Sequence, residues 1–391
     1  MRRLVQLSVI VVAIGLLTAA ALAVIAIAQG GSSNVYDEDY VVNADGSGLR
    51  QLTHDNHFHD GTVWSPDSRT IATATSGLKS VGGAGGEQTS QPALGPIELI
   101  PADGAGPRDL SLGDDVQDVG WQSDDRLVAL SPPASAQDPA GEPLGVGASA
   151  VVFDTNGQIL HRIAVRAISA SAWSPDGRTL AYLTTTSDGQ PLSTLWLQPV
   201  DGGPRRRVAQ LIGSPQLNDS DLSWAPDSRS LLVVLSDSAG ASLWLVPTAA
   251  GQRPRRLDIN FGDIGPPAIS PNGRLVALDA NLVISRRGGA TYTGNFLVLV
   301  PTSGGPARRL AGDEGAGAVW SPDGREIAFV ADRQDTPGAG DQPYDTVKTI
   351  WPDGSHEQAV VRLPGMSLDD LSWSPDGRRI AFDAGVWQPS D

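Results

Sequence analysis

One short phrase recurs seven times along this chain of 391 residues, at intervals of roughly 50 residues. In its fullest form it reads Trp-Ser-Pro-Asp-Gly-Arg and runs into an alternating apolar segment, as it does from Trp173 and from Trp320. A repeat of this length cannot bury its apolar face alone, so the copies must stack as a solenoid or a propeller. The seven copies begin at Trp64, Trp121, Trp173, Trp224, Ile269, Trp320 and Trp373.

The phrase has the chemistry of a tight turn between two strands. Proline presets φ at the second position of the turn, and glycine tolerates the geometry at its exit. The residues after the turn alternate with period two, as in Arg-Thr-Leu-Ala-Tyr-Leu from Arg178, which predicts a strand with one apolar face. The tryptophan ends the preceding strand, where its large apolar area would fill the space between neighbouring sheets.

Each unit continues with further turns and strands. In the third unit the pattern predicts strands at 167–174, 178–185, 193–200 and 204–211, separated by turns rich in Asp and Gly. Four antiparallel strands repeated radially predict a β-propeller. The chain contains 45 Gly and 29 Pro, which agrees with a turn-rich, all-β fold.

The two ends of the chain predict how the ring closes. After Phe382 too few residues remain for a third and a fourth strand, whereas 39–42 and 49–53 resemble a third and a fourth strand that lack a first and a second. Pairing the two ends completes one blade and leaves no open sheet edge. We therefore predict an all-β, seven-bladed propeller of four-stranded antiparallel blades over residues 35–384, as one domain.

The recurring phrase W-S-P-D-G-R-x-[IL]-A-[FY], with its D-G-G and D-G-S-G turns, resembles the PD40 (WD40-like) repeat of TolB-like β-propellers. The resemblance covers about residues 35–384 and implies the propeller fold. It also implies the range of roles found in that family, from periplasmic scaffold proteins to the propeller domains of prolyl-oligopeptidase-like peptidases. In such proteins the connection that holds residues 54–60 here faces the central channel.

An apolar segment precedes the predicted propeller. Arg2 and Arg3 come before a run from Leu4 to Ala28 that is long enough, as a helix, to span a hydrocarbon core of about 30 Å. Its length favours an uncleaved anchor, whereas its last residues, Ala26-Ile27-Ala28, fit the cleavage site of a removable signal peptide. The paired arginines place the N-terminus inside. Residues 1–30 are thus a membrane anchor or a signal peptide, and the rest is extracytoplasmic: anchored, periplasmic or secreted.

Composition and missing motifs exclude several classes of function. The net charge of −16 opposes binding to nucleic acid, and the absence of cysteine removes disulfides, thiol catalysis and cysteine-based zinc sites. No G-x-S-x-G motif, P-loop or dinucleotide fingerprint occurs in the sequence. We therefore predict no enzymatic activity and no cofactor. The predicted role is that of a monomeric binding or scaffold protein for a protein or peptide partner.

Three stretches are longer than ordinary hairpin loops: Ser76–Pro96, Pro132–Ser149 and Asp332–Pro343. Each lies between the predicted second and third strands of a blade, so all three should emerge on the same face of the disc. Insertions that gather on one face predict a binding face. The alternative is flexible decoration, since their composition is small and polar.

Three of the five histidines, His54, His57 and His59, fall within six residues, beside Asp55 and Asp60. Imidazole and carboxylate together suit Zn, Ni or Mn, so these histidines are the candidate metal ligands. The alternative is a solvated loop, because a metal site needs three or four convergent ligands. A metal-dependent ligand-binding protein or enzyme at the channel mouth is accordingly the alternative function.

Acidic residues precede several copies of the phrase at similar positions. Such residues could ring one end of the channel and bind a cation or a basic peptide. The alternative is that they cap the turns through which the chain enters each strand. They are Asp60, Asp118, Asp221, Asp263, Glu314 and Asp369.

Overall fold

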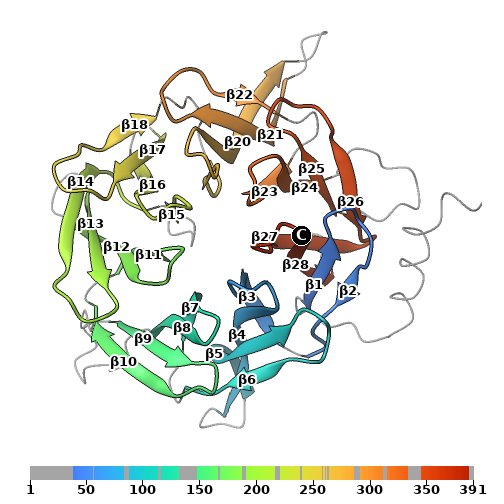
Figure 1. Cartoon of the computed structure of the whole chain (residues 1–391). Coiled ribbons are helices and arrows are strands. Elements are labelled where there is room, and N and C mark those ends of the chain that lie inside the picture. Colours follow the sequence, from blue (N-terminus) through green and yellow to red (C-terminus); the bar gives the residue numbers. More distant parts are fainter. Residues whose placement is uncertain are drawn as a thin grey trace, which may run out of the picture.

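The computed structural model shows seven four-stranded antiparallel sheets arranged around a central axis (Figure 1). The predicted seven-bladed propeller is thus confirmed, and every regular element of the described residues is a strand. No helix among these residues is long and apolar enough to span a bilayer, and the predicted anchor or signal segment, residues 1–30, lies outside them. The structure describes residues 38–386, except 56, 83–87, 113–115, 132–147, 166–167, 187–190, 216–220, 238–239, 258, 260, 262–263, 286–290, 311–314 and 333–344.

The blades follow the chain in order, with the first strand of each lying nearest the axis (Figure 1). Blade 1 consists of β3 (Phe58–Trp64), β4 (Thr70–Gly82), β5 (Gln88–Pro101) and β6 (Arg108–Leu110). Blade 2 consists of β7 (Gln117–Ser123), β8 (Arg126–Ser131), β9 (Ser149–Asp154) and β10 (Ile159–Ala164). Blade 3 consists of β11 (Ala170–Trp173), β12 (Thr179–Thr186), β13 (Leu192–Pro199) and β14 (Arg206–Ile212).

The other half of the ring repeats this plan. Blade 4 consists of β15 (Leu222–Trp224), β16 (Ser230–Asp237), β17 (Gly240–Pro247) and β18 (Arg255–Leu257). Blade 5 consists of β19 (Ala268–Ile269), β20 (Leu275–Ser285), β21 (Thr291–Pro301) and β22 (Arg308–Arg309). Blade 6 consists of β23 (Gly315–Trp320), β24 (Ile327–Asp332), β25 (Asp345–Ile350) and β26 (Gln358–Arg362). Blade 7 consists of β27 (Met366–Trp373), β28 (Arg379–Val386), β1 (Glu38–Asn43) and β2 (Arg50–Gln51).

The N-terminal strands close the ring, as predicted. Strand β1 pairs antiparallel with β28 along its whole length, from Glu38 opposite Ala384 to Asn43 opposite Arg379. The rings of Tyr40 and Phe382 stack across this seam with their centroids 5.6 Å apart. Residues that are more than 300 positions apart in the sequence thus share one sheet, and β28 has no open edge.

The recurring turn is held by a repeated set of hydrogen bonds. In blade 1 the hydroxyl of Ser65 donates to Asp67 Oδ1 and accepts from the backbone amide of Thr70 at 2.9 Å. The same serine-to-aspartate bond forms at Ser174, at Ser321 and at Ser374. These serines are buried, so a single side chain satisfies the polar groups of each turn.

In five of the seven blades the tryptophan of the phrase links the blade to the one before it. The indole N–H of Trp121 donates to the carbonyl oxygen of Val63 at 2.9 Å, and that of Trp224 donates to Ala172 at 3.0 Å. Trp320 bonds Ala268 in the same way, and Trp64 bonds Ser372 across the seam. The indole therefore fills the space between sheets, as predicted, and also supplies a directional contact there.

The prediction of a loop over Ser76–Pro96 is wrong for most of that stretch. Strands β4 and β5 continue as a long two-stranded extension, paired from Thr70 opposite Pro101 out to Gly82 opposite Gln88. The small and polar residues there can still pair through their backbones, because an antiparallel ladder needs no particular side chain. The other two predicted insertions lie largely in 132–147 and 333–344, outside the described residues.

Candidate functional site

A group of buried and partly buried ionisable side chains lies where the last blade meets the first. We call Asp39, Asp55, His57, His59 and Glu98 the junction cluster. Asp39 belongs to β1 of blade 7, whereas His59 and Glu98 belong to β3 and β5 of blade 1. Asp55 and His57 lie on the connection between β2 and β3. Closure of the ring therefore brings the cluster together.

His59 is the centre of the cluster. Its side chain is fully buried, and its Nδ1 atom lies 2.6 Å from Oδ2 of Asp39, which is also fully buried. The backbone amide of Asp39 donates to the hydroxyl of Thr53 at 2.8 Å, which fixes that end of the pair. With Nδ1 directed at Asp39, the other ring nitrogen of His59 points the opposite way, 3.3 Å from Oδ1 of Asp55.

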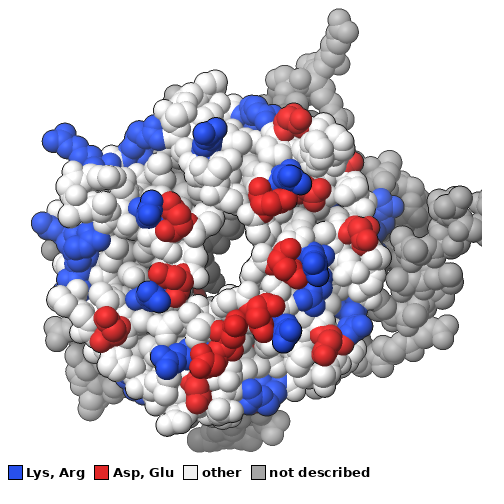
Figure 2. Space-filling view, viewed as in Figure 1, with Lys and Arg blue, Asp and Glu red and all other residues white. Residues whose placement is uncertain are grey.

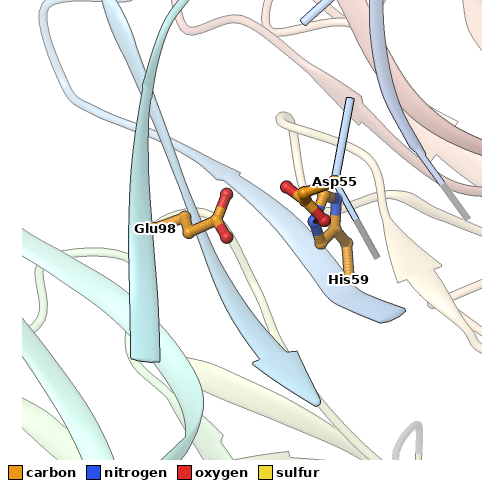
Figure 3. Close-up of side chains that lie close together, drawn as sticks. All are labelled: Asp55, His59 and Glu98. Atoms are coloured by element: carbon orange, nitrogen blue, oxygen red, sulfur yellow. Dashed lines mark ion pairs between the residues drawn. The ribbon is translucent and has the colours of Figure 1, made fainter. Parts of the chain in front are cut away.

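Glu98 completes a group of three potential ligands. Its carboxylate comes from β5 and faces Asp55 and His59, which come from β3 and the segment before it (Figure 3). One ligand atom from each of Asp55, His59 and Glu98 lies within 4.8 Å of the other two. An imidazole nitrogen and two carboxylates form a donor set that divalent transition metals accept.

The three histidines predicted from the sequence do not converge as a group. His59 belongs to the set above, and the Nδ1 atom of half-buried His57 lies 3.2 Å from Oε1 of Glu98. His54 is exposed and is not part of that set. Sequence reasoning missed Glu98 and Asp39: Glu98 stood out only as an acidic residue in the apolar segment Ile97–Ile100, and Asp39 lies in an acidic stretch with Asp37 and Glu38.

Burial and mutual repulsion shape the ionisation of the cluster. Burial would lower the pKa of His59, but the hydrogen bond and charge of Asp39, with the charges of Asp55 and Glu98, outweigh it and raise that pKa to about 9. Burial and the neighbouring charge of Asp55 raise the pKa of Glu98. Without a further cation, the site therefore contains a charged imidazole among carboxylates that repel one another.

A row of carboxylates leads from the cluster toward the axis. In blade 7, Asp39 lies directly opposite Asp383 on β28, and Asp383 lies directly opposite Asp369 on β27. Directly opposed residues point to the same face of a sheet. The row thus runs from buried Asp39, through buried Asp383, to exposed Asp369 on the innermost strand.

The acidic residues predicted to ring the channel have mixed environments. Asp118 is half-buried and accepts a 2.6 Å hydrogen bond from Ser171 of the next blade, and Asp221 is buried. Asp369 and its neighbour Asp370 are exposed on β27. The side chain of Asp60 and the residues Asp263 and Glu314 lie outside the described part of the structure. Figure 2 shows the disc open at its centre, with acidic and basic side chains next to one another around the opening.

Comparison with known proteins relates the chain to two kinds of propeller protein. No family model matches it. A stretch of 146 residues is 27% identical to the uncharacterized peptidase YuxL of Bacillus subtilis (strain 168), covering 28% of this chain and 21% of YuxL. The chain thus spans about a fifth of the length of that relative.

Solved structures agree on the fold. The putative TolB from Agrobacterium tumefaciens is 17% identical, with 92% of this chain and 100% of that chain covered and a TM-score of 0.50. The acylaminoacyl peptidase of Pyrococcus horikoshii is 12% identical, with 83% and 48% covered and a TM-score of 0.53. At these identities the structures show the fold alone, and at that level the resemblance to TolB-like propellers is confirmed.

The same comparisons contradict the prediction of a protein without enzymatic activity, because two of these three similar proteins are peptidases by name. The prediction depended on missing catalytic motifs. The absence of a short motif from a sequence does not decide its function, because one fold carries many functions. The repeat resembles a family that includes peptidase propellers, but the absence of catalytic motifs led the prediction away from them.

Proposed function

We propose that this chain serves peptide hydrolysis as a propeller that receives peptides with cationic groups at its central opening. The observation that carries the proposal is the sequence match to the peptidase YuxL over 146 residues. We assign the propeller the binding of the peptide.

The row of carboxylates in blade 7 is the reason for proposing a cationic ligand. Asp369 and Asp370 are exposed on the innermost strand, and the buried carboxylates of Asp383 and Asp39 continue the row behind Asp369. A single exposed ion pair contributes only about 0.2–1 kcal/mol, so several carboxylates must act together to select a basic peptide. The net charge of −16 adds a long-range attraction for such ligands at low ionic strength.

Fluorescence anisotropy with two labelled heptapeptides, one carrying three lysines and one three glutamates, tests the proposal. The lysine peptide should bind more tightly, and the double change Asp369→Asn with Asp370→Asn should weaken its binding about 2–30-fold. Asp353→Asn with Asp323→Asn, which removes two charges from exposed turns of blade 6, is the control. Equal binding of both peptides, or an unchanged affinity in the double variant, would contradict the proposal. Mass spectrometry of the same mixtures shows whether the peptide is cleaved.

We also propose that the propeller is a monomer located outside the cytoplasm, and that residues 1–30 direct its export as a signal peptide or a membrane anchor. The basis is the apolar run that follows Arg2 and Arg3. Protease added to intact cells with a permeabilised outer envelope should degrade the propeller, whereas a cytoplasmic marker protein should survive. Protection of both proteins would place the propeller inside. Light scattering of the purified chain gives its oligomeric state.

A further inference from the structure

We propose that Asp55, His59 and Glu98 bind one divalent metal ion, of the zinc or manganese class, at the junction of blade 7 and blade 1. The inference goes beyond peptide binding and does not depend on it. It starts from the geometry described above: one ligand atom of each residue lies within 4.8 Å of the others, and the His59 nitrogen is 3.3 Å from Oδ1 of Asp55.

These separations come close to those of an occupied site. Ligands bound at 2.0–2.2 Å in tetrahedral geometry lie roughly 3.4 Å from one another. Asp55 and His59 already have that spacing, so the carboxylate of Glu98 would have to approach by at most about 1.4 Å, the difference between 4.8 Å and 3.4 Å. A rotation of its side chain can supply such a shift without any movement of the strands.

Two buried atoms of the group lack hydrogen-bond partners among the described residues. They are Oε2 of Glu98 and Nε2 of His59, which makes only the 3.3 Å ion-pair contact with Asp55; both carboxylate oxygens of neighbouring Asp39 also lack a hydrogen-bond partner. An unpaired buried polar atom costs about 1–3 kcal/mol, and more when its group is charged. Both atoms belong to the group of three, and a metal ion placed there would satisfy them together.

The charge balance also calls for a cation. Asp39 and Glu98 are buried, and Asp55 is mostly so, yet the ion-pair partners of these three carboxylates in the described part of the chain are His57 and His59 alone. A single imidazolium cannot neutralise three carboxylates. A divalent ion bound to neutral His59 would reduce the excess from two negative charges to one, and the carboxylates beside it would coordinate the ion instead of only repelling one another.

Asp39 has the arrangement of a positioning residue for this site. A metal-bound histidine commonly donates its other N–H to a carboxylate, which fixes the tautomer and the ring orientation. Nδ1 of His59 lies 2.6 Å from Oδ2 of Asp39, close enough for such a pair, and Nε2 is left to face Asp55 and Glu98. His57 holds the other side by its contact with Oε1 of Glu98. Asp55 and His57 are partly exposed, so an ion could enter from their side.

The competing explanation is a metal-free network of histidine and carboxylate that only ties the two blades together. Titration calorimetry of the full chain in detergent, stripped with EDTA, separates the two. ZnCl₂ or MnCl₂ should bind at one site per chain, and CaCl₂ much more weakly, because calcium prefers all-oxygen ligand sets. A chain that binds none of the three ions at millimolar concentration would overturn the proposal.

Variants then locate the ion. His59→Gln and Glu98→Gln should abolish binding at the site, and Asp39→Asn should weaken it about 10–100-fold. His356→Gln, at an exposed histidine stacked on Trp351 in blade 6, should leave binding unchanged. Metal binding that survives both His59→Gln and Glu98→Gln would overturn the assignment.

A spectrum of the unmutated protein keeps the test decisive if those variants fail to fold. Co²⁺ bound by one imidazole and two carboxylates in a site of low coordination number should give visible absorption bands much stronger than those of the hydrated ion. Addition of one equivalent of Zn²⁺ should remove the bands. Co²⁺ that keeps the weak spectrum of the hydrated ion in the presence of the protein would contradict a built site.

Discussion

At the scale of single residues, the indole of Trp121 joins two blades through one hydrogen bond. Trp121→Phe keeps most of the apolar contact but leaves the carbonyl of Val63 without its 2.9 Å donor. Loss of the donor to this partly buried acceptor, together with the small cavity left by the shorter ring, should lower the free energy of unfolding by about 1–3 kcal/mol. Urea unfolding followed by fluorescence measures this loss.

Trp351→Phe is the matched control, because Trp351 is 39% exposed and lies on a turn of blade 6. A change at such a surface position should alter stability by less than about 0.5 kcal/mol. Equal losses in the two variants would mean that the indole N–H contributes nothing to the joint between blades.

The buried carboxyl of Asp279 should make the stability of the folded protein decrease as pH rises. Burial on β20 raises the pKa of its carboxyl, and a hydrogen bond from the backbone of Gly317 offsets this only in part. The native state therefore holds its proton to a higher pH than the unfolded chain does. As pH rises from about 4 through the raised pKa, the unfolded state ionises more readily, so Asp279 should lower stability increasingly.

Asp279→Asn should remove this pH-dependent loss of stability, because asparagine does not ionise but still offers an acceptor to the backbone of Gly317. Urea midpoints of the two proteins between pH 4 and pH 7.5 should diverge, with the variant gaining relative to the parent as pH rises. Asp353→Asn should show the opposite trend, because the hydroxyl and amide of Ser355 lower the pKa of Asp353 in the folded state. Parallel curves for Asp279→Asn and the parent would refute the interpretation.

At the scale of elements, the same turn meets different neighbours in different blades. Gly177 and Gly273 occupy the same position of the recurring turn and have similar φ angles of +61° and +69°. A Cβ at Gly177 would lie 2.5 Å from the backbone of Trp121 and Gln122 in the preceding blade, whereas one at Gly273 would meet nothing within 4 Å. Space between blades thus differs although the local conformation does not.

Gly273→Ala should therefore cost about 1 kcal/mol, the strain of a left-handed alanine, whereas Gly177→Ala should cost that amount and the clash in addition. Chemical denaturation of the two single variants gives the comparison directly. Equal destabilisation would show that the blades separate enough to accept a methyl group at no further cost.

These elements also show what sequence could predict. The turn around Ser65 and Asp67 depends on residues within five positions of one another, so its chemistry is visible in the sequence and fixes the number of blades. The extension of β4 and β5 was missed because backbone pairing leaves no side-chain pattern in a segment of small residues. Strands and turns could therefore be predicted where side chains close in sequence determine them.

At the scale of the whole molecule, the candidate metal site depends on ring closure. His59 drew notice because histidines are rare in this chain and gather near it. Asp39 and Glu98 reach the same place through the register of β1 on β28 and of β5 on β4, over distances that no local pattern records. His54, although a neighbour in sequence, is exposed instead. A concentration of histidine and aspartate residues in the sequence therefore indicates where a metal site lies, whereas the fold determines which residues form it.

Closure of the ring by β1 and β2 should be needed for a stable monomer. A chain that lacks residues 1–53 keeps six complete blades but leaves β28 as an open edge strand, because β1 covers it from Glu38 to Asn43. It also exposes Phe382, on which Tyr40 stacks. Open edges promote pairing with other chains, so this truncated protein should self-associate and unfold at a lower urea concentration.

A synthetic peptide spanning residues 36–53 should reverse both effects by adding the missing strands in trans. The same peptide with Tyr40→Ala and Val42→Ala should rescue poorly, because both side chains are buried in the core of blade 7. Light scattering and urea unfolding are measured with each peptide. A truncated protein that stays monomeric with the parent midpoint, or one rescued equally by both peptides, would mean that six blades and two strands already form the stable unit.

Removal of β1 also removes Asp39, so any metal affinity should fall in the truncated protein. It should return only when the unmodified peptide restores the strand.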